Sequence, residues 1–420
     1  MQAKLATIRK EYAALNPEDL TLIDPCMGSG HILVYAFDVL MQIYESVGYS
    51  QRDAAKSILE HNLYGLDIDD RAYQLAYFAV MMKARQYNRR ILNGENTCHV
   101  HAIQESNPIN RAHLKFFGAG LSDLEKNTAK MQLEGLLDIL TDAKEYGSIL
   151  NVPEYNWALL RRFVGGIDDE VQISLESAGV EETAEELQKL IDLGETMARK
   201  YWVTCTNPPY LGVSDCDEEL NRYVKGNYFE TKTDMFAVFM AKCHEMAETN
   251  GFCAMLTQQA WMFLKSFTDV RCRVCENNIV SMVHLGTRAF EDVAGEIVQP
   301  TSFTIRKCFL KNYLSAFVRL VEYGSQKQKE DAYLSGKNRY YICLEKFRQI
   351  ENNPISYWVP NILFEIFSGE MKISDFGDVR VGMQTGENDK FVRLWEEISY
   401  DELKTDSKNA NEAQKSQCRW

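Results

Sequence analysis

The feature that most constrains the fold is a regular alternation of short apolar runs and longer amphipathic runs between about Leu20 and Ser106. The short runs, which we interpret as strands, are LTLID, NLYGLDI and CHVHAIQ. The longer runs, which we interpret as helices, are GSGHILVYAFDVLMQIYESVG and DDRAYQLAYFAVMMKARQY. Strands that alternate with helices of this length predict an α/β, Rossmann-like fold with a doubly wound, mostly parallel sheet.

The rest of the chain predicts an insertion and a closing edge for this sheet. Residues 120–200 are acidic and helical in pattern, and strand-like patterning resumes at YWVTCTNPPY, FCAMLT and IVSMVHLG. We expect PTSFTIRKCFL and SAFVRLVEY to be closing antiparallel strands. After Gly324 the composition becomes polar, so we predict one catalytic domain over 1–325 and a linker or second region over 326–420.

A glycine-rich loop, Asp24-Pro25-Cys26-Met27-Gly28-Ser29-Gly30, joins the first predicted strand to the first helix. Glycines at such a turn let the backbone approach a ligand closely, although many turns use glycine for geometry alone. The loop lacks the Lys-Ser/Thr pair of a phosphate-binding loop and the third glycine of the nicotinamide fingerprint. The carboxylate of Asp24 repels a pyrophosphate but can pair with a cationic amino-acid head group.

Acidic residues follow the next two strands. Asp67 ends the second strand, where a carboxylate can accept both hydroxyls of a ribose, and Ile68 beside it can pack on an adenine ring. Glu105 follows the third strand, where it can accept from an exocyclic amine or serve as a helix-start carboxylate. Ligands of open α/β sheets bind at these strand ends, so we expect the loops to share one site.

The most informative motif is Asn207-Pro208-Pro209-Tyr210, after the strand that ends near Cys205. The lone pair of the adenine N6 amine is delocalised into the ring, so acceptors aimed at its hydrogens favour attack and stabilise the charge that develops. We expect the Asn207 side-chain oxygen and the Pro208 carbonyl to be these acceptors. The prolines stiffen the loop, and no general base is needed before transfer. The alternative is a structural proline-rich turn.

Aromatic residues complete the predicted base pocket. The Tyr210 ring offers a face on which an extruded base can stack, because a base in a duplex cannot reach such a pocket until it is flipped out. Phe290, in TRAFED, is the candidate for the second face, with core packing as the alternative role.

Taken together, these residues resemble the γ-ordered amino-methyltransferases that act on adenine in DNA, over roughly residues 20–325. The resemblance implies S-adenosylmethionine as cofactor, with Asp24, Gly28 and Gly30 at its methionine end and Asp67 at its ribose. It also implies that Asp234, in KTDMF, lines the cofactor pocket, and that double-stranded DNA carrying a flipped adenine is the substrate.

GHILVYAFD, the acidic insertion and GENDKFVRLW are similar to the PglX adenine methyltransferases of BREX phage-defence systems. This resemblance implies self-marking in phage defence, with other defence proteins as partners. Cys26 and Met27 depart from the family's DPACGSGH, and neither side chain is expected to be essential. Family members are longer, so we expect an N-terminal region and most of the target-recognition domain to lie outside this chain. We therefore expect weak cofactor binding and little sequence-specific methylation by these residues alone.

Composition and cysteine usage limit the remaining possibilities. The formal net charge is −14, which disfavours phosphate contacts unless basic residues gather on one face or belong to a missing recognition domain. Eleven scattered cysteines predict reduced thiols, and there is no apolar run long enough to cross a bilayer, so we expect a cytoplasmic protein. Cys272 and Cys275 have CxxC spacing but no second pair, and His99 and His101 read as same-face strand residues, so we predict no metal site.

Four alternatives to a stand-alone adenine methyltransferase remain open. The chain can be the methylation module of a combined restriction and modification enzyme. Asn-Pro-Pro-Tyr loops also occur in enzymes that methylate glutamine in proteins or amines in RNA. A non-enzymatic scaffold and a nucleotide-dependent oxidoreductase are further possibilities for this fold.

Overall fold

The computed structural model describes residues 2–94, 96–167, 179–290 and 298–367, together with the single positions 369, 377 and 399. Residues 1–367 form one compact unit. The segment 386–395, which contains the GENDKF motif, lies outside the described residues. Within the described part, no helix is long and apolar enough to span a membrane.

The described residues form one nine-stranded sheet with the order β3-β2-β1-β4-β5-β7-β6-β8-β9. The strands are β1 (Leu22–Asp24), β2 (Leu63–Asp67), β3 (His99–Ala102), β4 (Tyr201–Thr206), β5 (Ala247–Gln258), β6 (Asn278–His284), β7 (Pro300–Arg306), β8 (Leu314–Arg319) and β9 (Arg339–Cys343). Strands β1 to β5 are parallel, whereas β7 is antiparallel to both of its neighbours. The predicted mostly parallel α/β sheet with an antiparallel edge is confirmed.

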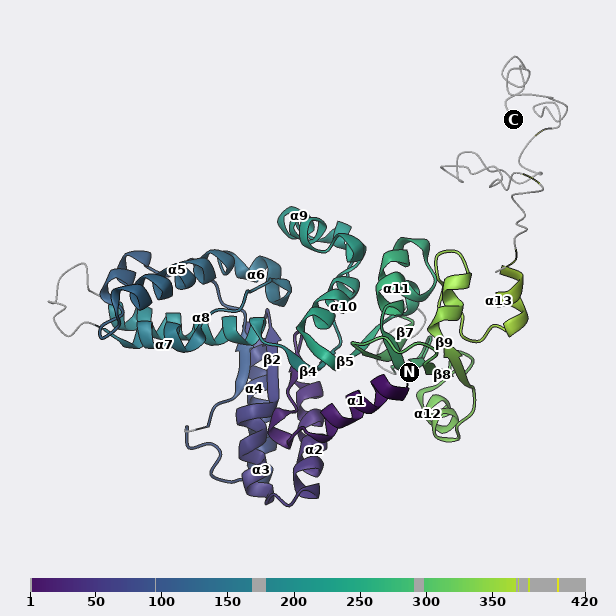
Figure 1. The fold of residues 1–420 in the computed structure, drawn as a ribbon, viewed down its shortest axis with the longest axis horizontal. Coiled ribbons are helices and arrows are strands. Elements are labelled where there is room, and N and C mark those ends of the chain that lie inside the picture. Colours follow the sequence, from purple (N-terminus) through teal and green to yellow (C-terminus); the bar gives the residue numbers. More distant parts are fainter. Residues whose placement is uncertain are drawn as a thin grey trace, which may run out of the picture. The chain divides into compact units, whose positions relative to one another are not determined.

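Helices cover both faces of the sheet (Figure 1). They are α1 (Gln2–Ala13), α2 (His31–Ser46), α3 (Gln51–Ser57), α4 (Asp70–Tyr87), α5 (Asp123–Ile139), α6 (Ala143–Tyr146), α7 (Trp157–Gly165), α8 (Val180–Ala198), α9 (Glu218–Asn227), α10 (Met235–Met246), α11 (Thr268–Cys275), α12 (Gln326–Leu334) and α13 (Asn361–Phe367). Helices α2 to α4 pack on one face through residues such as Leu33 and Val80, and α10 and α11 pack on the other.

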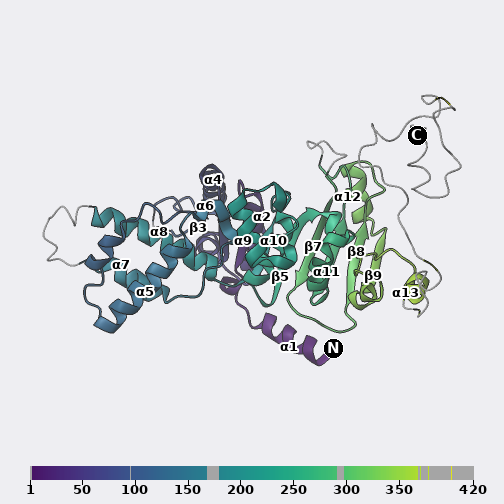
Figure 2. The ribbon, with the colours of Figure 1, turned by 90° about the horizontal axis from the view of Figure 1, so that it is seen from above.

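The acidic segment predicted as an insertion is helical. Helices α5 to α8 gather beyond the β2–β3 end of the sheet, while β8, β9 and α12 lie at the opposite end (Figure 2). The insertion has a core of its own around Leu136, Leu160 and Leu190, which is continuous with the sheet residues Tyr64 and Tyr201. Burial of this apolar face stabilises helices whose outer surfaces are acidic.

The closing strands depart from the sequence-based expectation in one respect. Strand β7 is antiparallel as predicted, but β8 runs parallel to β6, with Met282 opposite Phe317. The reason is that β7 lies between β5 and β6, so the following strand pairs with the free edge of β6. Strand β9 then pairs antiparallel with β8, so the compact unit continues beyond the boundary predicted at residue 325 to Phe367.

Candidate active site

The two glycines of the loop after β1 have different surroundings. Gly30 precedes α2 with φ +82°, and a Cβ there would lie 3.0 Å from the Cα of Ala76. Gly28 has φ +53°, and a Cβ there would meet nothing within 4 Å. Gly30 is therefore required by helix packing, whereas Gly28 borders open space that a ligand can approach.

Asp67 holds this loop in place from the end of β2. Its Oδ2 accepts from the backbone N–H of Gly28 at 2.8 Å, and its Oδ1 accepts from the N–H of Asp69 at 2.9 Å. Each carboxylate oxygen has a second lone pair, so Asp67 can still accept from ligand hydroxyls.

Asp24 is the most perturbed acid of the site. It is 1% exposed, and its Oδ1 accepts from the N–H of Cys26 at 3.1 Å. Within the described residues, Asp24 Oδ2 and the nearby Thr206 Oγ1 are buried without a partner. Burial raises the pKa of Asp24 to about 7, against the lowering effect of the nearby Thr206 hydroxyl and of the Cys26 N–H, and the negative charge of Asp67 adds a smaller increase. A buried carboxylate oxygen without a partner fits a cationic ligand group.

The Asn-Pro-Pro-Tyr loop leaves the sheet beside the glycine loop. Strand β4 pairs in parallel with β1, with Leu22 opposite Val203 and Ile23 opposite Thr204. The carboxyl ends of both strands therefore lie at the same edge. Asn207 and Pro209 are exposed, while Pro208 is buried.

Tyr210 is fixed by its ring and by its hydroxyl. The hydroxyl donates to Asn207 Oδ1 at 3.0 Å and lies 3.3 Å from the carbonyl oxygen of Leu256 in β5. The ring stands edge-on to Phe236, with centroids 6.3 Å apart and an interplanar angle of 89°. Burial raises the pKa of Tyr210 to about 12, so the hydroxyl keeps its proton.

Asp234 ties the end of this loop to α10. Its side chain caps the helix by accepting from the N–H of Phe236 at 3.1 Å. The N–H of Met235 donates to the carbonyl of Leu211 at 2.9 Å, and Gly212 forms an isolated bridge with Asp234. Asp234 thus lies next to the catalytic loop, half-buried, and burial raises its pKa.

A connecting segment from the insertion, residues 147–151, lies against the glycine loop. The Ser148 hydroxyl donates to the carbonyl of Pro25 at 2.6 Å. A Cβ on Gly147 would meet the Ile68 side chain at 3.3 Å, which places Ile68 between this segment and the end of β2. The half-exposed Ile68 side chain keeps an apolar surface available to a ligand.

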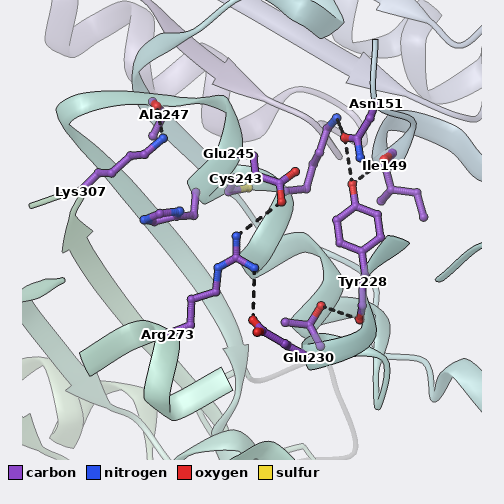
Figure 3. Close-up of polar contacts among 12 residues, drawn as sticks. Ile149, Asn151, Tyr228, Glu230, Cys243, Glu245, Ala247, Arg273 and Lys307 are labelled. Atoms are coloured by element: carbon purple, nitrogen blue, oxygen red, sulfur yellow. Dashed lines mark hydrogen bonds and ion pairs between the residues drawn. The ribbon is translucent and has the colours of Figure 1, made fainter. Parts of the chain in front are cut away.

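Two buried donors, the Tyr228 hydroxyl and the Lys242 ammonium, hold residues 147–151 in place. The Tyr228 hydroxyl donates to the Ile149 carbonyl at 2.6 Å and lies 3.2 Å from Asn151 Oδ1 (Figure 3). The Lys242 ammonium, buried in α10, donates to the Leu150 carbonyl at 2.6 Å and to Asn151 Oδ1 at 3.0 Å. Residues 147–151 are therefore a fixed wall of the site.

A salt-bridge group braces the helices behind this wall. Arg273 in α11 lies 3.4 Å from Glu245 and 3.7 Å from Glu230, and Lys307 donates to the Ala247 carbonyl at 2.8 Å (Figure 3). These contacts connect α10, α11 and the sheet, so they hold the frame on which the catalytic loop rests.

Two predicted site residues have different surroundings from those expected. Glu105 accepts from the backbone N–H of Lys144 at 3.2 Å, at the start of α6, which is the helix-start role that the sequence left open. Phe290 is 44% exposed at the end of a described segment, and no contact with Tyr210 is seen among the described residues. Its role as a second stacking face stays a prediction.

The residues weighed as metal ligands are also placed. His99 and His101 share one face of β3, as predicted. Cys272 is exposed on α11 and Cys275 is buried. Over the described ranges, no group of three His, Cys, Asp or Glu side chains is arranged to hold a metal ion.

Three residues that contact the site were not assigned a role from the sequence. For Thr206 a signal existed, because it ends a strand and directly precedes the Asn-Pro-Pro-Tyr motif. Phe236 and Ser148 had none, because their contacts with Tyr210 and Pro25 join segments far apart in the chain.

Comparisons with known proteins find two related methylase families and two curated relatives. The N-6 DNA Methylase family matches residues 7–111. The chain is 37% identical over 404 residues to the adenine-specific methyltransferase PglX of Lacticaseibacillus casei (strain Zhang), covering 93% of this chain and 33% of that protein. It is 34% identical over 424 residues to the adenine-specific methyltransferase BrxX of Escherichia coli O9:H4 (strain HS), covering 95% and 34%.

Among solved structures, the DrdV–DNA complex has a TM-score of 0.46 at 13% identity and covers 82% of this chain and 28% of the other. The chain spans about a third of the length of the two curated relatives. The Eco57I restriction-modification methylase family matches residues 61–290, which is more than half of the chain and includes Asp67, the Asn-Pro-Pro-Tyr motif and Asp234. The chain belongs to the Eco57I restriction-modification methylase family.

Proposed function

We propose that this chain carries the catalytic site of a DNA methyltransferase that moves a methyl group from S-adenosylmethionine to N6 of a flipped adenine in duplex DNA. The observation that supports it most directly is the parallel pairing of β1 with β4. This pairing brings the glycine loop and the Asn-Pro-Pro-Tyr loop to one edge of the sheet.

The glycine-loop side of the site fits the cofactor. Asp24 Oδ2 would accept from the cationic amine, Gly28 would allow close approach of the backbone, and Asp67 would accept from the ribose hydroxyls. Ile68 offers an apolar surface for the adenine ring. When bound, S-adenosylmethionine supplies a methyl group activated on a sulfonium.

The catalytic loop fits the acceptor amine. The Asn207 side-chain oxygen and the Pro208 carbonyl would accept from the two N6 hydrogens, which localises the nitrogen lone pair and stabilises the positive charge that develops. Proline rigidity and the contacts of Tyr210 fix these acceptors before substrate arrives. The Tyr210 ring would stack on the flipped base.

The biological role we propose is self-marking of DNA in phage defence. Its support is the similarity to PglX and BrxX over more than nine-tenths of this chain. With a net charge of −14, phosphate contacts would come from basic residues gathered on one face of this chain, or from a recognition domain or a partner of the defence system.

The test is incorporation of labelled methyl groups by the full-length gene product into DNA, RNA and protein, assayed side by side. We expect label in duplex DNA, at N6 of adenine, and loss of that label in Asn207→Ala. Label in RNA or protein but not in DNA would overturn the substrate, and failure to bind S-adenosylmethionine in calorimetry would overturn the cofactor.

A further inference from the structure

A groove lies at the same edge of the sheet as the Asn-Pro-Pro-Tyr loop. It consists of two adjoining hollows of about 270 and 370 Å³ that share Gln259, Phe263 and Gln299. Its lining residues come from the carboxyl ends of β5, β6 and β8 and the segments that follow them, from the start of β7, and from Trp358 before α13. One hollow is lined by Gln258, two residues beyond Leu256 in β5, and the Leu256 carbonyl lies 3.3 Å from the Tyr210 hydroxyl. A base held at Tyr210 and a base held in this groove would therefore lie along the same edge of the sheet.

The lining has the chemistry of a surface that contacts nucleobases. It combines carboxamides, aromatic rings and one arginine, and the residues described there include no aspartate or glutamate, in a chain with 60 acidic and 46 basic residues. The Arg319 guanidinium lies 4.6 Å from the centre of the Trp358 ring and pairs with Glu322 beside the groove. Amides, arginine and aromatic faces are the groups that read base edges and stack on bases.

Four side chains form a continuous hydrogen-bonded series that ends in the groove. Tyr357 and His284 Nδ1 are 3.0 Å apart, His284 Nε2 contacts Gln259 Oε1, and Gln259 Nε2 donates to Gln299 Oε1. The backbone N–H of Gln259 also donates to the Gln299 carbonyl at 2.8 Å. We call Tyr357, His284, Gln259 and Gln299 the relay.

The hydrogen bonds of the relay have a defined donor-to-acceptor direction. With the Gln259 amide oriented as in this structure, its Oε1 accepts from His284 Nε2–H, and His284 Nδ1 then accepts from the Tyr357 hydroxyl. Burial, aided by the Arg319 charge, lowers the pKa of His284 to about 4, so the ring has a single proton. The oxygen of Gln299 is occupied by Gln259. Its NH₂ group has no protein partner within the described ranges and is exposed at the groove.

We propose that Gln299 reads a hydrogen-bond acceptor on the major-groove edge of one base flanking the flipped adenine, and that Gln259 and His284 are positioning residues that keep its NH₂ group facing the DNA. The inference rests on the proposed function and adds a specificity-determining residue to it. Guanine, adenine and thymine each offer an acceptor on the major-groove edge, whereas cytosine offers an amine donor. Gln299 therefore disfavours cytosine at the position it contacts.

The experiment measures single-turnover methylation by the full-length enzyme on duplexes that carry each of the four base pairs at every position flanking the target adenine. We expect wild type to disfavour cytosine at one position by about tenfold. Gln299→Ala should remove this preference, and Gln299→Glu, which presents an acceptor, should shift it toward cytosine. Gln259→Ala should weaken the preference while Gln299 is still present. Gln51→Ala removes an exposed carboxamide of α3 that does not line the groove, so it should leave the preference intact.

Two outcomes overturn the inference while leaving the proposed function in place. One is wild-type methylation of DNA with the same base preferences in Gln299→Ala and Gln299→Glu. The other is a preference for cytosine in wild type, which would mean that Gln299 presents its oxygen. Absence of methyl transfer to any DNA by the wild-type enzyme would instead overturn the proposed function. As a control, thermal melting of each variant tests whether the substitution leaves the fold intact.

Discussion

The Tyr210 hydroxyl donates to the side-chain oxygen of Asn207 across 3.0 Å, so these two side chains of the Asn-Pro-Pro-Tyr loop hold each other. The edge-on contact with Phe236 fixes the ring, and the hydrogen bond fixes which end of the Asn207 amide faces Tyr210. Tyr210 therefore has two separable properties, a ring face for the base and a hydroxyl for the amide.

Two substitutions of Tyr210 separate these properties. Tyr210→Phe keeps the ring and loses one hydrogen bond, so the transfer rate should fall by about 2- to 10-fold. Tyr210→Ala also loses stacking on the base, worth about 1–3 kcal/mol, so it should be clearly slower. Single-turnover transfer measures both rates, with cofactor affinity as the control. Equal loss in the two variants would contradict a stacking role.

Removal of the Asn207 amide should slow transfer strongly while leaving cofactor binding nearly unchanged. Asn207→Ala deletes one of two proposed acceptors for the developing charge, and the loss of one such group costs about 10²–10³ in rate. Asn207→Asp keeps an acceptor oxygen and should retain more activity than the alanine variant. The measurements are transfer rate and calorimetric affinity for S-adenosylmethionine. Wild-type rates in Asn207→Ala would refute the assignment.

The pKa of Asp24 predicts pH-dependent cofactor binding. Burial raises this pKa from 3.8 to about 7, and the ionised form is needed to pair with a cationic amine. Affinity for S-adenosylmethionine should therefore increase as pH rises toward 7, by up to about tenfold per pH unit. Asp24→Asn should bind weakly with a flatter pH profile in calorimetry. A wild-type profile in the variant would show that Asp24 does not contact the amine.

The raised pKa of Asp24 has the opposite effect on folding stability, which should fall as pH rises. The folded state favours protonated Asp24, so this residue lowers the free energy of unfolding progressively as pH rises from about 4 to 7. Asp24→Asn should remove that decline, which urea denaturation of both proteins measures at several pH values.

Gly28 and Gly30 form a matched pair for separating ligand approach from packing. Gly30→Ala adds a Cβ 3.0 Å from Ala76 at φ +82°, so it should lower the free energy of unfolding by about 2–4 kcal/mol. Gly28→Ala meets only open space, so it should cost about 1 kcal/mol of backbone strain but weaken cofactor binding. Denaturation and calorimetry test both. Unchanged cofactor affinity in Gly28→Ala would contradict its place in the cofactor site.

Local sequence patterns predicted the strands and loops whose conformation depends mainly on residues that are neighbours in the chain. Short apolar runs predicted β1, β2 and β4, and the parallel sheet then required their loops to share an edge. The position of β8 was not predictable, because it depends on which edge of β6 remains free after β7 has paired. The contacts of Ser148 with Pro25 and of Tyr357 with His284 join segments more than 70 residues apart, so no local pattern encodes them.

The buried ammonium of Lys242 predicts a pH dependence of the wall formed by residues 147–151. Burial lowers its pKa from 10.5 to about 8, so the folded state releases the proton before the unfolded state does. Below pH 8 the buried charge of Lys242 lowers the free energy of unfolding in full, and this loss disappears as pH rises from 8 to 10.5. The stability of wild type relative to Lys242→Met should therefore increase over this window, by about 3 kcal/mol. Urea denaturation at pH 7.5, 9 and 10.5 measures the difference, and the comparison cancels the tyrosines and cysteines that titrate in both proteins. A difference that is constant with pH would show that Lys242 is not buried as an ammonium against Leu150 and Asn151.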